Sequence, residues 1–173
     1  MNAEFKSLYL SDCQRNTGGG YVLRLLWLLR LASTTKNWFI RTVCAKVLHY
    51  YKCKYGLEIQ YTTRIGKGLY LGHAYNITIN PKAIIGNYCN IHKGATIGQE
   101  NRGHRKGVPT IGNYVYIGVN ATISGNIVIG DDVMIGPNCH VNQDIPPHSV
   151  VFGNPCIVKH RDHATENYIS SVY

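Results

Sequence analysis

The chain has 173 residues and carries 18 Lys and Arg against 9 Asp and Glu, which gives a formal net charge of +9. This length fits one domain with an appendage, and the basic balance favours an anionic partner such as a phosphorylated cofactor, an acidic sugar or a lipid headgroup. Nucleic acid is the least favoured anionic partner, because no recognition motif is present.

The first 55 residues are predicted to form an arm and a helical cap. Residues 1–20 are expected to be a loose arm that ends in three glycines. Residues 21–32 fit a helix that is too short and too charged to span a bilayer. A second helix is expected to follow a cap at residues 33–35. Its apolar residues at helical spacing are Ile40, Val43, Cys44, Val47, Leu48 and Tyr51.

These helices allow two interpretations. The favoured one is that they pack on each other and on the following structure as a terminal cap. The alternative is a peripheral contact in which a basic amphipathic face rests on an anionic membrane. The basic residues of the second helix are Arg41, Lys46, Lys52 and Lys54.

A six-residue repeat fills more than half of the chain, and a repeat of fixed period can decide the fold. From residue 111 the branched apolar residues that open each repeat are Ile111, Ile117, Ile123, Ile129, Ile135 and Val141. Two earlier runs keep the same step, namely Ile79, Ile85, Ile91 and Ile97 and, out of phase with them, Ile59, Ile65, Leu71 and Ile77. A small or β-branched residue usually follows four places after each opener.

The period of six predicts a parallel β-helix. The opener and the residue four places later share one face of an extended strand, while Gly and Asn between them favour a turn. Three repeats close one triangular coil, so the chain holds about five coils, enough for a stable stack. The predicted fold class is an all-β solenoid with a small N-terminal α-helical cap. A β-sandwich is disfavoured because its strand and loop lengths would vary.

The cysteines indicate a reducing compartment. The chain has six of them, and none forms a Cys-x-x-Cys pair. Cys89 and Cys139 fall at inward repeat positions, where free thiols act as small hydrophobic side chains. We therefore expect neither a disulfide framework nor a signal peptide, and we expect a cytoplasmic protein.

One insertion interrupts the repeat at residues 99–110. It contains two glycines and the basic residues Arg102, Arg105 and Lys106, with His104 between them. Loops carried on a rigid scaffold are places where binding groups concentrate. We therefore expect a protruding, positively charged loop with a binding role.

Several motifs resemble the hexapeptide-repeat acyltransferases. Gly-Leu-Glu-Ile at 56–59, Gly-His-Ala at 72–74 and Gly-Asn-Pro-Cys-Ile-Val at 153–158 are similar to serine acetyltransferases. Asn-Ile-His-Lys-Gly-Ala-Thr-Ile-Gly at 90–98 and Gly-Val-Pro-Thr-Ile-Gly at 107–112 are closer to exopolysaccharide O-acetyltransferases of the colanic-acid type. The resemblance covers about residues 55–160.

The resemblance implies a left-handed β-helix, with acetyl-CoA as co-substrate, no metal, and a homotrimer whose active sites lie between subunits. It divides the chain into an arm and helical cap at 1–55, an acyltransferase domain at 56–158 and a tail at 159–173. It also implies that His73 is the general base and that Glu58 orients it. A neutral imidazole can remove the proton of a hydroxyl during attack on a thioester, and a carboxylate fixes its tautomer.

Further site residues follow from the same resemblance and from position. Those expected to bind the pantetheine arm of coenzyme A are Gly98, Gly118, Val119, Gly136 and Pro137, with Lys159 and Arg161 near the phosphates. Those expected to bind the acceptor are Asn90, His92, Arg102 and His104. His92 could also be the base itself, and the loop cations could serve the phosphates.

Departures from the serine acetyltransferase pattern favour a sugar hydroxyl as acceptor. Gly72 replaces an acidic residue, Gly107 and Val108 replace an Arg-His pair, and Pro81 replaces another acid. The predicted function is therefore acetyl transfer from acetyl-CoA to a sugar or polysaccharide precursor, with L-serine as the alternative acceptor. A metal enzyme similar to γ-carbonic anhydrases is disfavoured because no two histidines have the required spacing. A non-catalytic scaffold would leave His73 and Glu58 unexplained.

Overall fold

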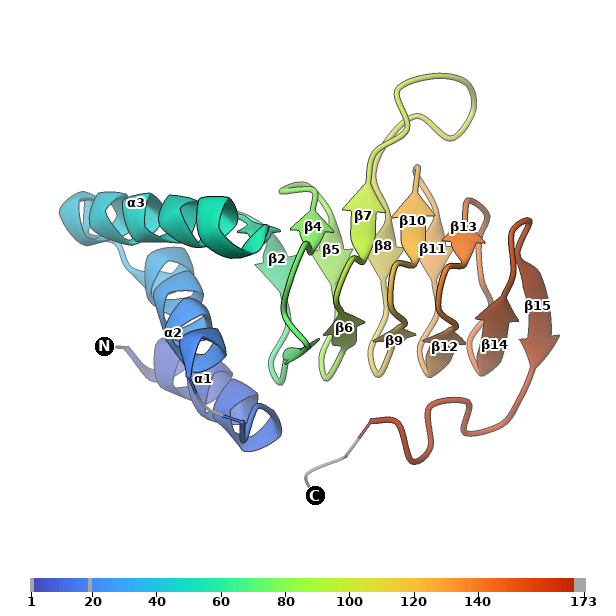
Figure 1. Ribbon diagram of the computed structural model, residues 1–173, viewed down its shortest axis with the longest axis horizontal. Coiled ribbons are helices and arrows are strands. Elements are labelled where there is room, and N and C mark those ends of the chain that lie inside the picture. Colours follow the sequence, from blue (N-terminus) through green and yellow to red (C-terminus); the bar gives the residue numbers. More distant parts are fainter. Residues whose placement is uncertain (1, 19, 170–173) are drawn as a thin grey trace.

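The computed structural model describes residues 2–18 and 20–169. It is a left-handed parallel β-helix of about five coils, with helices at the N-terminal end of the stack (Figure 1). The fold class predicted from the repeat is confirmed. After the last coil the chain turns and runs back along one side of the β-helix.

Three sheets form the sides of the β-helix, and all their strand pairs are parallel except that of β14 with β15. Face 1 contains β1 (Glu58–Ile59), β4 (Thr78–Ile79), β7 (Thr96–Gly98), β10 (Thr122–Ser124) and β13 (His140–Val141). Face 2 contains β2 (Arg64–Ile65), β5 (Ile84–Ile85), β8 (Thr110–Ile111) and β11 (Val128–Ile129). Face 3 contains β3 (Tyr70–Gly72), β6 (Asn90–His92), β9 (Tyr116–Ile117), β12 (Val133–Ile135), β14 (Ser149–Phe152) and β15 (Ile157–His160).

The repeat openers form the core of the coils. Ile117 pairs with Ile91 and with Ile135 on the neighbouring strands of face 3, so identical side chains stack in register. These side chains are buried, as are Cys89 and Cys139 at the fourth position of their repeats. Burial raises the pKa of the Cys89 thiol to about 12, so this thiol stays protonated and unreactive near neutral pH.

The helical region begins earlier than the sequence indicates. The prediction of a loose arm over residues 1–20 is wrong, because α1 spans Ala3–Arg15 and Asn2 caps it by accepting a hydrogen bond from the amide of Phe5 at 2.8 Å. The side that α1 buries is mainly polar, with Asp12 and Arg15 facing the coils. A search for apolar residues at helical spacing therefore could not detect this helix.

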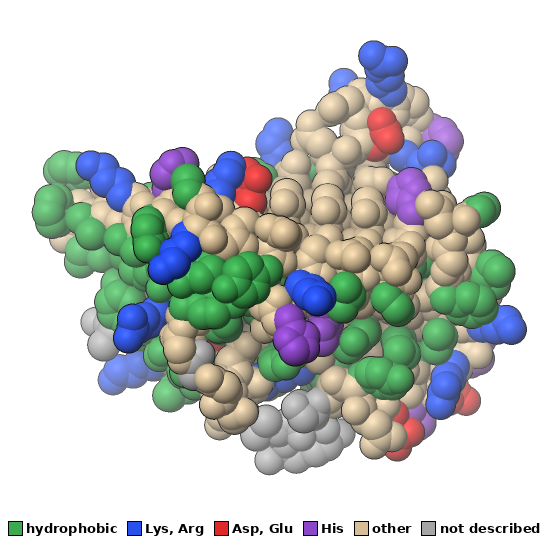
Figure 2. Space-filling model, viewed as in Figure 1, with side chains coloured by type: hydrophobic (Ala, Val, Ile, Leu, Met, Phe, Trp, Pro, Cys, Tyr) green, Lys and Arg blue, Asp and Glu red, His purple; other side chains and the backbone are tan. Residues whose placement is uncertain are grey.

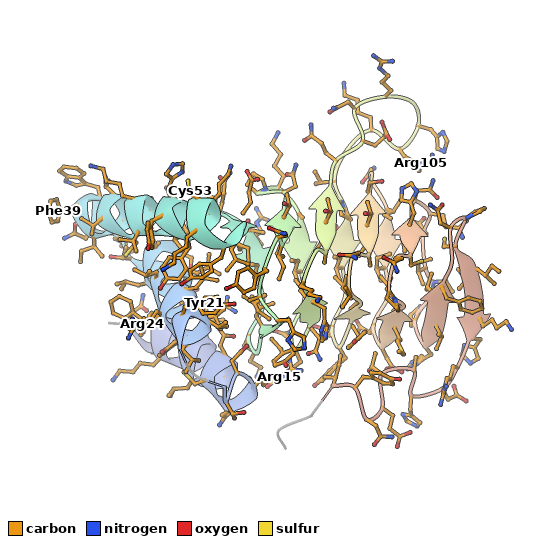
Figure 3. The ribbon with its side chains drawn as sticks, viewed as in Figure 1. Arg15, Tyr21, Arg24, Phe39, Cys53 and Arg105 are labelled. Carbon is orange, nitrogen blue, oxygen red and sulfur yellow. The ribbon has the colours of Figure 1, made fainter. Side chains whose placement is uncertain are left out.

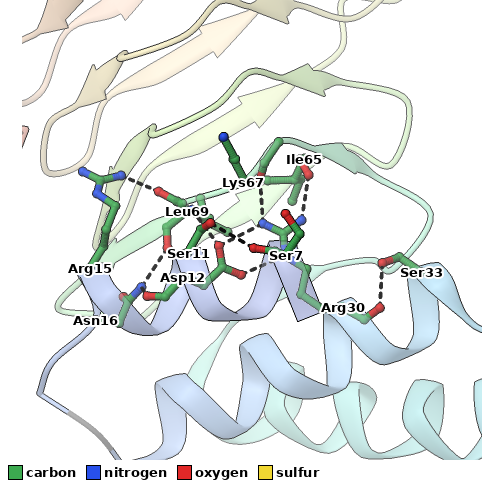
Figure 4. Close-up of polar contacts among 12 residues, drawn as sticks. Ser7, Ser11, Asp12, Arg15, Asn16, Arg30, Ser33, Ile65, Lys67 and Leu69 are labelled. Atoms are coloured by element: carbon green, nitrogen blue, oxygen red, sulfur yellow. Dashed lines mark hydrogen bonds and ion pairs between the residues drawn. The ribbon is translucent and has the colours of Figure 1, made fainter. Parts of the chain in front are cut away.

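Side chains of α1 take the place of a missing coil beneath β3. The amide of Leu69 donates to Asp12 Oδ1 at 2.9 Å, and the Leu69 carbonyl accepts from Asn16 Nδ2 at 2.7 Å (Figure 4). Asn16 also accepts from the amide of Leu71 at 3.1 Å, and Arg15 donates to the carbonyl of Gly68. The first strand of a stack otherwise leaves such backbone groups unpaired. The helical cap predicted from the sequence therefore works through polar side chains.

A buried ion pair joins α1 to α2 (Tyr21–Thr34). Arg30 Nε donates to Asp12 Oδ2 at 2.8 Å, and both side chains are almost completely buried. The same guanidinium donates to the carbonyls of Ile65 at 2.7 Å and Gly66 at 2.6 Å. Arg30 thereby closes the open edge of face 2, as the α1 residues close that of face 3 (Figure 4).

The second predicted helix corresponds to α3, which spans Trp38–Tyr55. Its cap is Asn37, whose Oδ1 accepts from the amides of Phe39 and Ile40, and the expected cap at 33–35 is wrong because α2 continues to Thr34. Of the six apolar positions predicted for this helix, Cys44, Leu48 and Tyr51 are buried. The other three, Ile40, Val43 and Val47, are exposed.

The C-terminal segment is more ordered than a tail beginning at residue 159 would suggest. Residues 159 and 160 belong to β15, which pairs antiparallel with β14. Beyond it, Asp132 accepts hydrogen bonds from the amides of Ala164 at 3.0 Å and Thr165 at 2.9 Å. These contacts hold the segment against face 3.

Candidate active site

His73 lies at the corner where the chain leaves face 3 for face 1. It follows the last residue of β3, has a left-handed φ of 50°, and its side chain is exposed. A left-handed φ is uncommon for a residue other than glycine. Tyr21 at the start of α2 supports the corner by donating from its hydroxyl to the carbonyl of Ala74 at 2.9 Å. The cap thus fixes the loop that carries His73 (Figure 3).

His92 occupies the next coil, in register with Gly72. Its ring lies directly against that glycine, because a Cβ atom on Gly72 would be 2.3 Å from Nδ1 of His92. The rings of Tyr70 and Tyr116 flank it, with centroids at 5.9 Å and 4.7 Å. The imidazole of His92 therefore fills the space that the missing side chain at residue 72 leaves open.

The pKa of His92 depends on its burial and on the neighbouring His73. Burial lowers the pKa of His92, and the nearby imidazole of His73 lowers it further when charged. Nε2 of His92 is buried and has no hydrogen-bond partner among the described residues. Face 3 and the C-terminal segment form a groove that His92 lines together with Tyr70 and Tyr116. A neutral imidazole with a free nitrogen therefore lies beside the predicted base.

This contact predicts a conditional effect of Gly72→Ala. We expect this change to lower the free energy of unfolding by about 1–3 kcal/mol, because the new methyl group overlaps the His92 ring. The loss should shrink when His92→Ala is already present. Gly98→Ala is a matched control at the end of β7, where a Cβ would meet only Thr96 Cγ2 at 3.9 Å. Urea unfolding of the wild type, the two single variants, the double variant and the Gly98→Ala control measures the effect, and equal losses in both His92 backgrounds would contradict the contact.

Most residues predicted to bind coenzyme A lie in one column, meaning equivalent positions on successive coils of face 3. Pairing of β6 with β9 and of β9 with β12 carries the Gly72–His92 position on to Gly118 and Gly136. Val119 and Pro137 lie at the corresponding corners, in line with His73. Gly118 and Gly136 are buried, and a Cβ on Gly118 would lie 2.8 Å from the backbone of Gly136, so glycine here allows successive coils to stack closely. Gly98 ends β7 on face 1 and lies at a different corner.

The two cations predicted for the phosphates lie apart. Lys159 Nζ is 5.6 Å from the ring centroid of Phe152, and Phe152 continues the column of Gly118 and Gly136 on β14. The backbone amide of Arg161 instead donates to the carbonyl of His148 at 2.8 Å, where the chain enters face 3. Only Lys159 therefore lies at the end of the column.

Glu58 belongs to the same corner as His73 but pairs with another residue. Its amide donates to the carbonyl of Ile77 at 2.8 Å, which places it one coil below the segment that follows His73. Its carboxylate accepts from Lys52 Nζ at 2.6 Å, and both side chains are partly exposed. No hydrogen bond joins Glu58 to His73 in the part of the chain that the structure describes. The orienting role of Glu58 stays a prediction.

The remaining acceptor candidates do not converge on His73. The loop carrying Arg102 and His104 projects from the end of β7, and Glu100 and Gly107 close its base through two backbone hydrogen bonds of 3.0 and 2.9 Å (Figures 1 and 3). Within residues 2–18 and 20–169, no hydrogen bond or ion pair joins either loop residue to His73 or His92. The protruding loop itself is observed, and its binding role stays a prediction.

Asn90 has structural partners on both sides. Its Oδ1 accepts from Arg15 Nη2 at 2.5 Å, and its Nδ2 donates to the carbonyl of Tyr168 at 3.0 Å. The side chain is buried and links α1 to the C-terminal segment. Arg15, which the sequence did not single out, approaches the site only because α1 folds against it. The hydrogen bonds of Asn90 argue against its predicted acceptor contact.

Among the described residues, no group of three or more His, Cys, Asp or Glu side chains is arranged to hold a metal ion. The same residues contain no helix whose length and apolarity would allow it to cross a bilayer.

Comparisons with known proteins agree on the type of repeat. Residues 109–143 match the family model described as bacterial transferase hexapeptide (six repeats). A serine acetyltransferase of Synechococcus elongatus is 38% identical over 106 residues, which are 61% of this chain and 43% of the relative. A serine acetyltransferase of Helicobacter pylori is 37% identical over 99 residues, which are 57% of this chain and 58% of the relative. The chain thus spans about half the length of these relatives.

Solved structures give the same result over more of the chain. Soybean serine acetyltransferase complexed with serine has a TM-score of 0.78 at 25% identity, covering 91% of this chain and 70% of that one. The Neisseria gonorrhoeae serine acetyltransferase in complex with serine has a TM-score of 0.75 at 27% identity, covering 90% and 69%.

These findings correct one prediction and support another. The expectation of a sugar or polysaccharide acceptor is wrong, because the relatives and the structural neighbours are serine acetyltransferases. The similarity favours the alternative acceptor, L-serine. Residues 109–143 therefore match hexapeptide-repeat transferases, and the chain is similar to serine acetyltransferases over about 60% of its length.

Proposed function

We propose that this protein is an acetyl-CoA-dependent O-acetyltransferase that acts on L-serine. The observation that carries the proposal is the position of His73, an exposed imidazole at a coil corner within the β-helix that resembles serine acetyltransferases. The proposal combines three predictions from the sequence: O-acetyl transfer, acetyl-CoA as co-substrate, and L-serine as the alternative acceptor. Because the chain spans only part of its relatives, the activity is a proposal for this chain.

The proposed reaction needs one proton carrier. His73 removes the proton of the serine hydroxyl as its oxygen attacks the thioester carbonyl of acetyl-CoA, and a tetrahedral intermediate forms. When that intermediate collapses, the carbon–sulfur bond breaks and the imidazolium returns the proton to the departing thiolate. The products are O-acetylserine and free coenzyme A. The exposed position of His73 leaves its imidazole accessible to the hydroxyl whose proton it removes.

Glu58 would orient His73 only after exchanging its partner. Its contact with Lys52 is between partly exposed side chains, and such pairs contribute about 0–1 kcal/mol. This small energy can be replaced when the imidazolium forms, because the developing positive charge attracts the carboxylate. We therefore propose that Glu58 is shared between Lys52 in the resting protein and His73 during the reaction.

Acetyl-CoA is proposed to lie along the column above His92. The corners at Val119 and Pro137 beside this column are accessible to a flexible chain, and Lys159 near the end of the column offers a cation for a phosphate. His92 would then lie between the co-substrate and His73. In this arrangement the neutral imidazole accepts a hydrogen bond from the ammonium group or hydroxyl of the acceptor.

We further propose a homotrimer with active sites between subunits and a cytoplasmic location. All six cysteines carry free thiols, which suits a reducing compartment. Light scattering after gel filtration should give the mass of three chains of 19.4 kDa each. A monomer that is fully active would contradict the shared site.

Release of free coenzyme A from acetyl-CoA tests the activity. We expect rapid thiol release with L-serine, detected by a chromogenic disulfide, and O-acetylserine as the product in mass spectrometry. L-alanine is the matched control acceptor because it lacks only the hydroxyl. Equal thiol release with both amino acids would show hydrolysis without transfer and would reject the proposed function.

A further inference from the structure

The outer side of α3 is a continuous exposed apolar surface. Trp38 and Phe39 at its start are 74% and 62% exposed. The exposed apolar residues of this helix, here called the α3 outer face, are Trp38, Phe39, Ile40, Val43, Val47 and Tyr50. Residues 39, 43, 47 and 50 follow helical spacing, so they form one stripe along the helix. Figure 2 shows these hydrophobic side chains covering the end of α3 that projects beyond the coils.

This stripe is separate from the packing side of the helix. Cys44, Leu48 and Tyr51 face α2 and the first coil and are buried. Phe39 points away from the rest of the protein at the free end of α3 (Figure 3). A soluble domain rarely leaves a contiguous apolar surface of this kind without a partner.

The charged residues of α2 and α3 are all basic, although Glu4 of α1 lines a hollow together with Arg41 near the start of α3. No Asp or Glu occurs between Asp12 and Glu58 in the sequence, whereas eight Lys and Arg residues lie there. Two of these are buried and Lys52 pairs with Glu58, which leaves Arg24, Lys36, Lys46 and Lys54 exposed and Arg41 partly exposed. Arg24 lies on α2 three residues after Tyr21, whose ring stacks on Tyr55 at the end of α3 nearest the coils (Figure 3). The surface is therefore both apolar and positively charged.

We propose that the α3 outer face binds the surface of an anionic lipid bilayer, with α3 lying in the plane of the headgroups. Aromatic side chains at such an interface enter the headgroup region while basic side chains pair with lipid phosphates. A second copy of the chain is a poorer occupant. Symmetric pairing of two such faces would bring Lys46 and Lys54 of both copies into one interface, with no acidic side chain on the face to compensate.

Vesicle co-sedimentation of the full chain tests this proposal. We expect binding to vesicles of phosphatidylcholine mixed with phosphatidylglycerol and much weaker binding to phosphatidylcholine alone. Trp38→Ser combined with Phe39→Ser should abolish binding, and the blue shift of tryptophan emission on vesicle addition should disappear with it. Lys46→Gln and Lys54→Gln should each lower the partition coefficient by about fivefold, the effect of one basic residue near an anionic surface.

A matched control uses equally exposed apolar residues of the β-helix. Val128 and Ile157 are 56% and 53% exposed, and changing both to Ser should leave vesicle binding unchanged. Equal binding by the α3 variant and the wild type would overturn the proposal. It would also be overturned if vesicles failed to bind and the α3 variant had a smaller mass in light scattering, since a second copy would then cover the face. Neither readout depends on the proposed enzymatic activity.

Discussion

His73→Ala should reduce transfer to L-serine by about 10²- to 10⁴-fold, the usual contribution of a general base. The imidazole lies on the exposed side of a coil corner that Tyr21 supports through the carbonyl of Ala74, and this bond does not involve the His73 side chain. The fold should therefore survive the change. Steady-state rates of thiol release measure the loss, and isothermal titration should find coenzyme A binding nearly intact.

Two further variants test whether the loss is specific to His73. His49→Ala removes an exposed histidine of α3 and should leave the rate unchanged. His92→Ala should raise KM for serine more than it lowers kcat, because His92 is proposed to hold the acceptor. If His73→Ala kept its turnover and His92→Ala lost it, the base would be His92, the alternative that the sequence left open.

Asp12→Ala should lower the free energy of unfolding by about 3–5 kcal/mol, the cost of leaving a buried charge without its partner. Asp12 pairs with Arg30 at 2.8 Å and also accepts a hydrogen bond from the amide of Leu69. The change therefore leaves the Arg30 Nε–H and the Leu69 N–H buried without their acceptor. The midpoint of urea unfolding measures this loss.

The control for this prediction is Asp162→Ala. That carboxylate also has a polar partner, His160 at 3.2 Å, but both side chains are largely exposed, and we expect a change below about 1 kcal/mol. Similar midpoints for the two variants would mean that the Asp12–Arg30 pair does not hold the helices on the first coil. Loss of activity in Asp12→Ala at temperatures where it is folded would further link the cap to the corner of His73.

The site was partly predictable because its residues sit in the repeat. Spacing alone puts His73, His92, Gly118 and Gly136 near one edge once coils of known length are stacked. The contact of His92 with Gly72 was not predictable, since it depends on how adjacent coils align and on which way a ring turns. The acceptor was predicted wrongly because missing serine-binding residues were given more weight than the overall similarity of the β-helix.

The helical cap was less predictable from the sequence than the β-helix. The sequence identified α2 and most of α3 through their apolar residues, but it missed α1, whose buried side is made of Asp12, Arg15 and Asn16. These polar side chains can be buried because they form hydrogen bonds with backbone groups of Gly68, Leu69 and Leu71, which have no neighbouring coil to pair with. No local pattern in residues 1–20 carries that information.

The sequence by itself determined the β-helix, because a repeat of six residues can satisfy its backbone and bury its Ile and Val side chains only by coiling in threes. Only the tertiary structure decided how the stack begins and which groups meet at its corners. Those contacts join residues more than fifty positions apart, such as Arg15 with Gly68 and Tyr21 with Ala74. They depend on three-dimensional complementarity between a helix and an open strand edge, which no periodicity records.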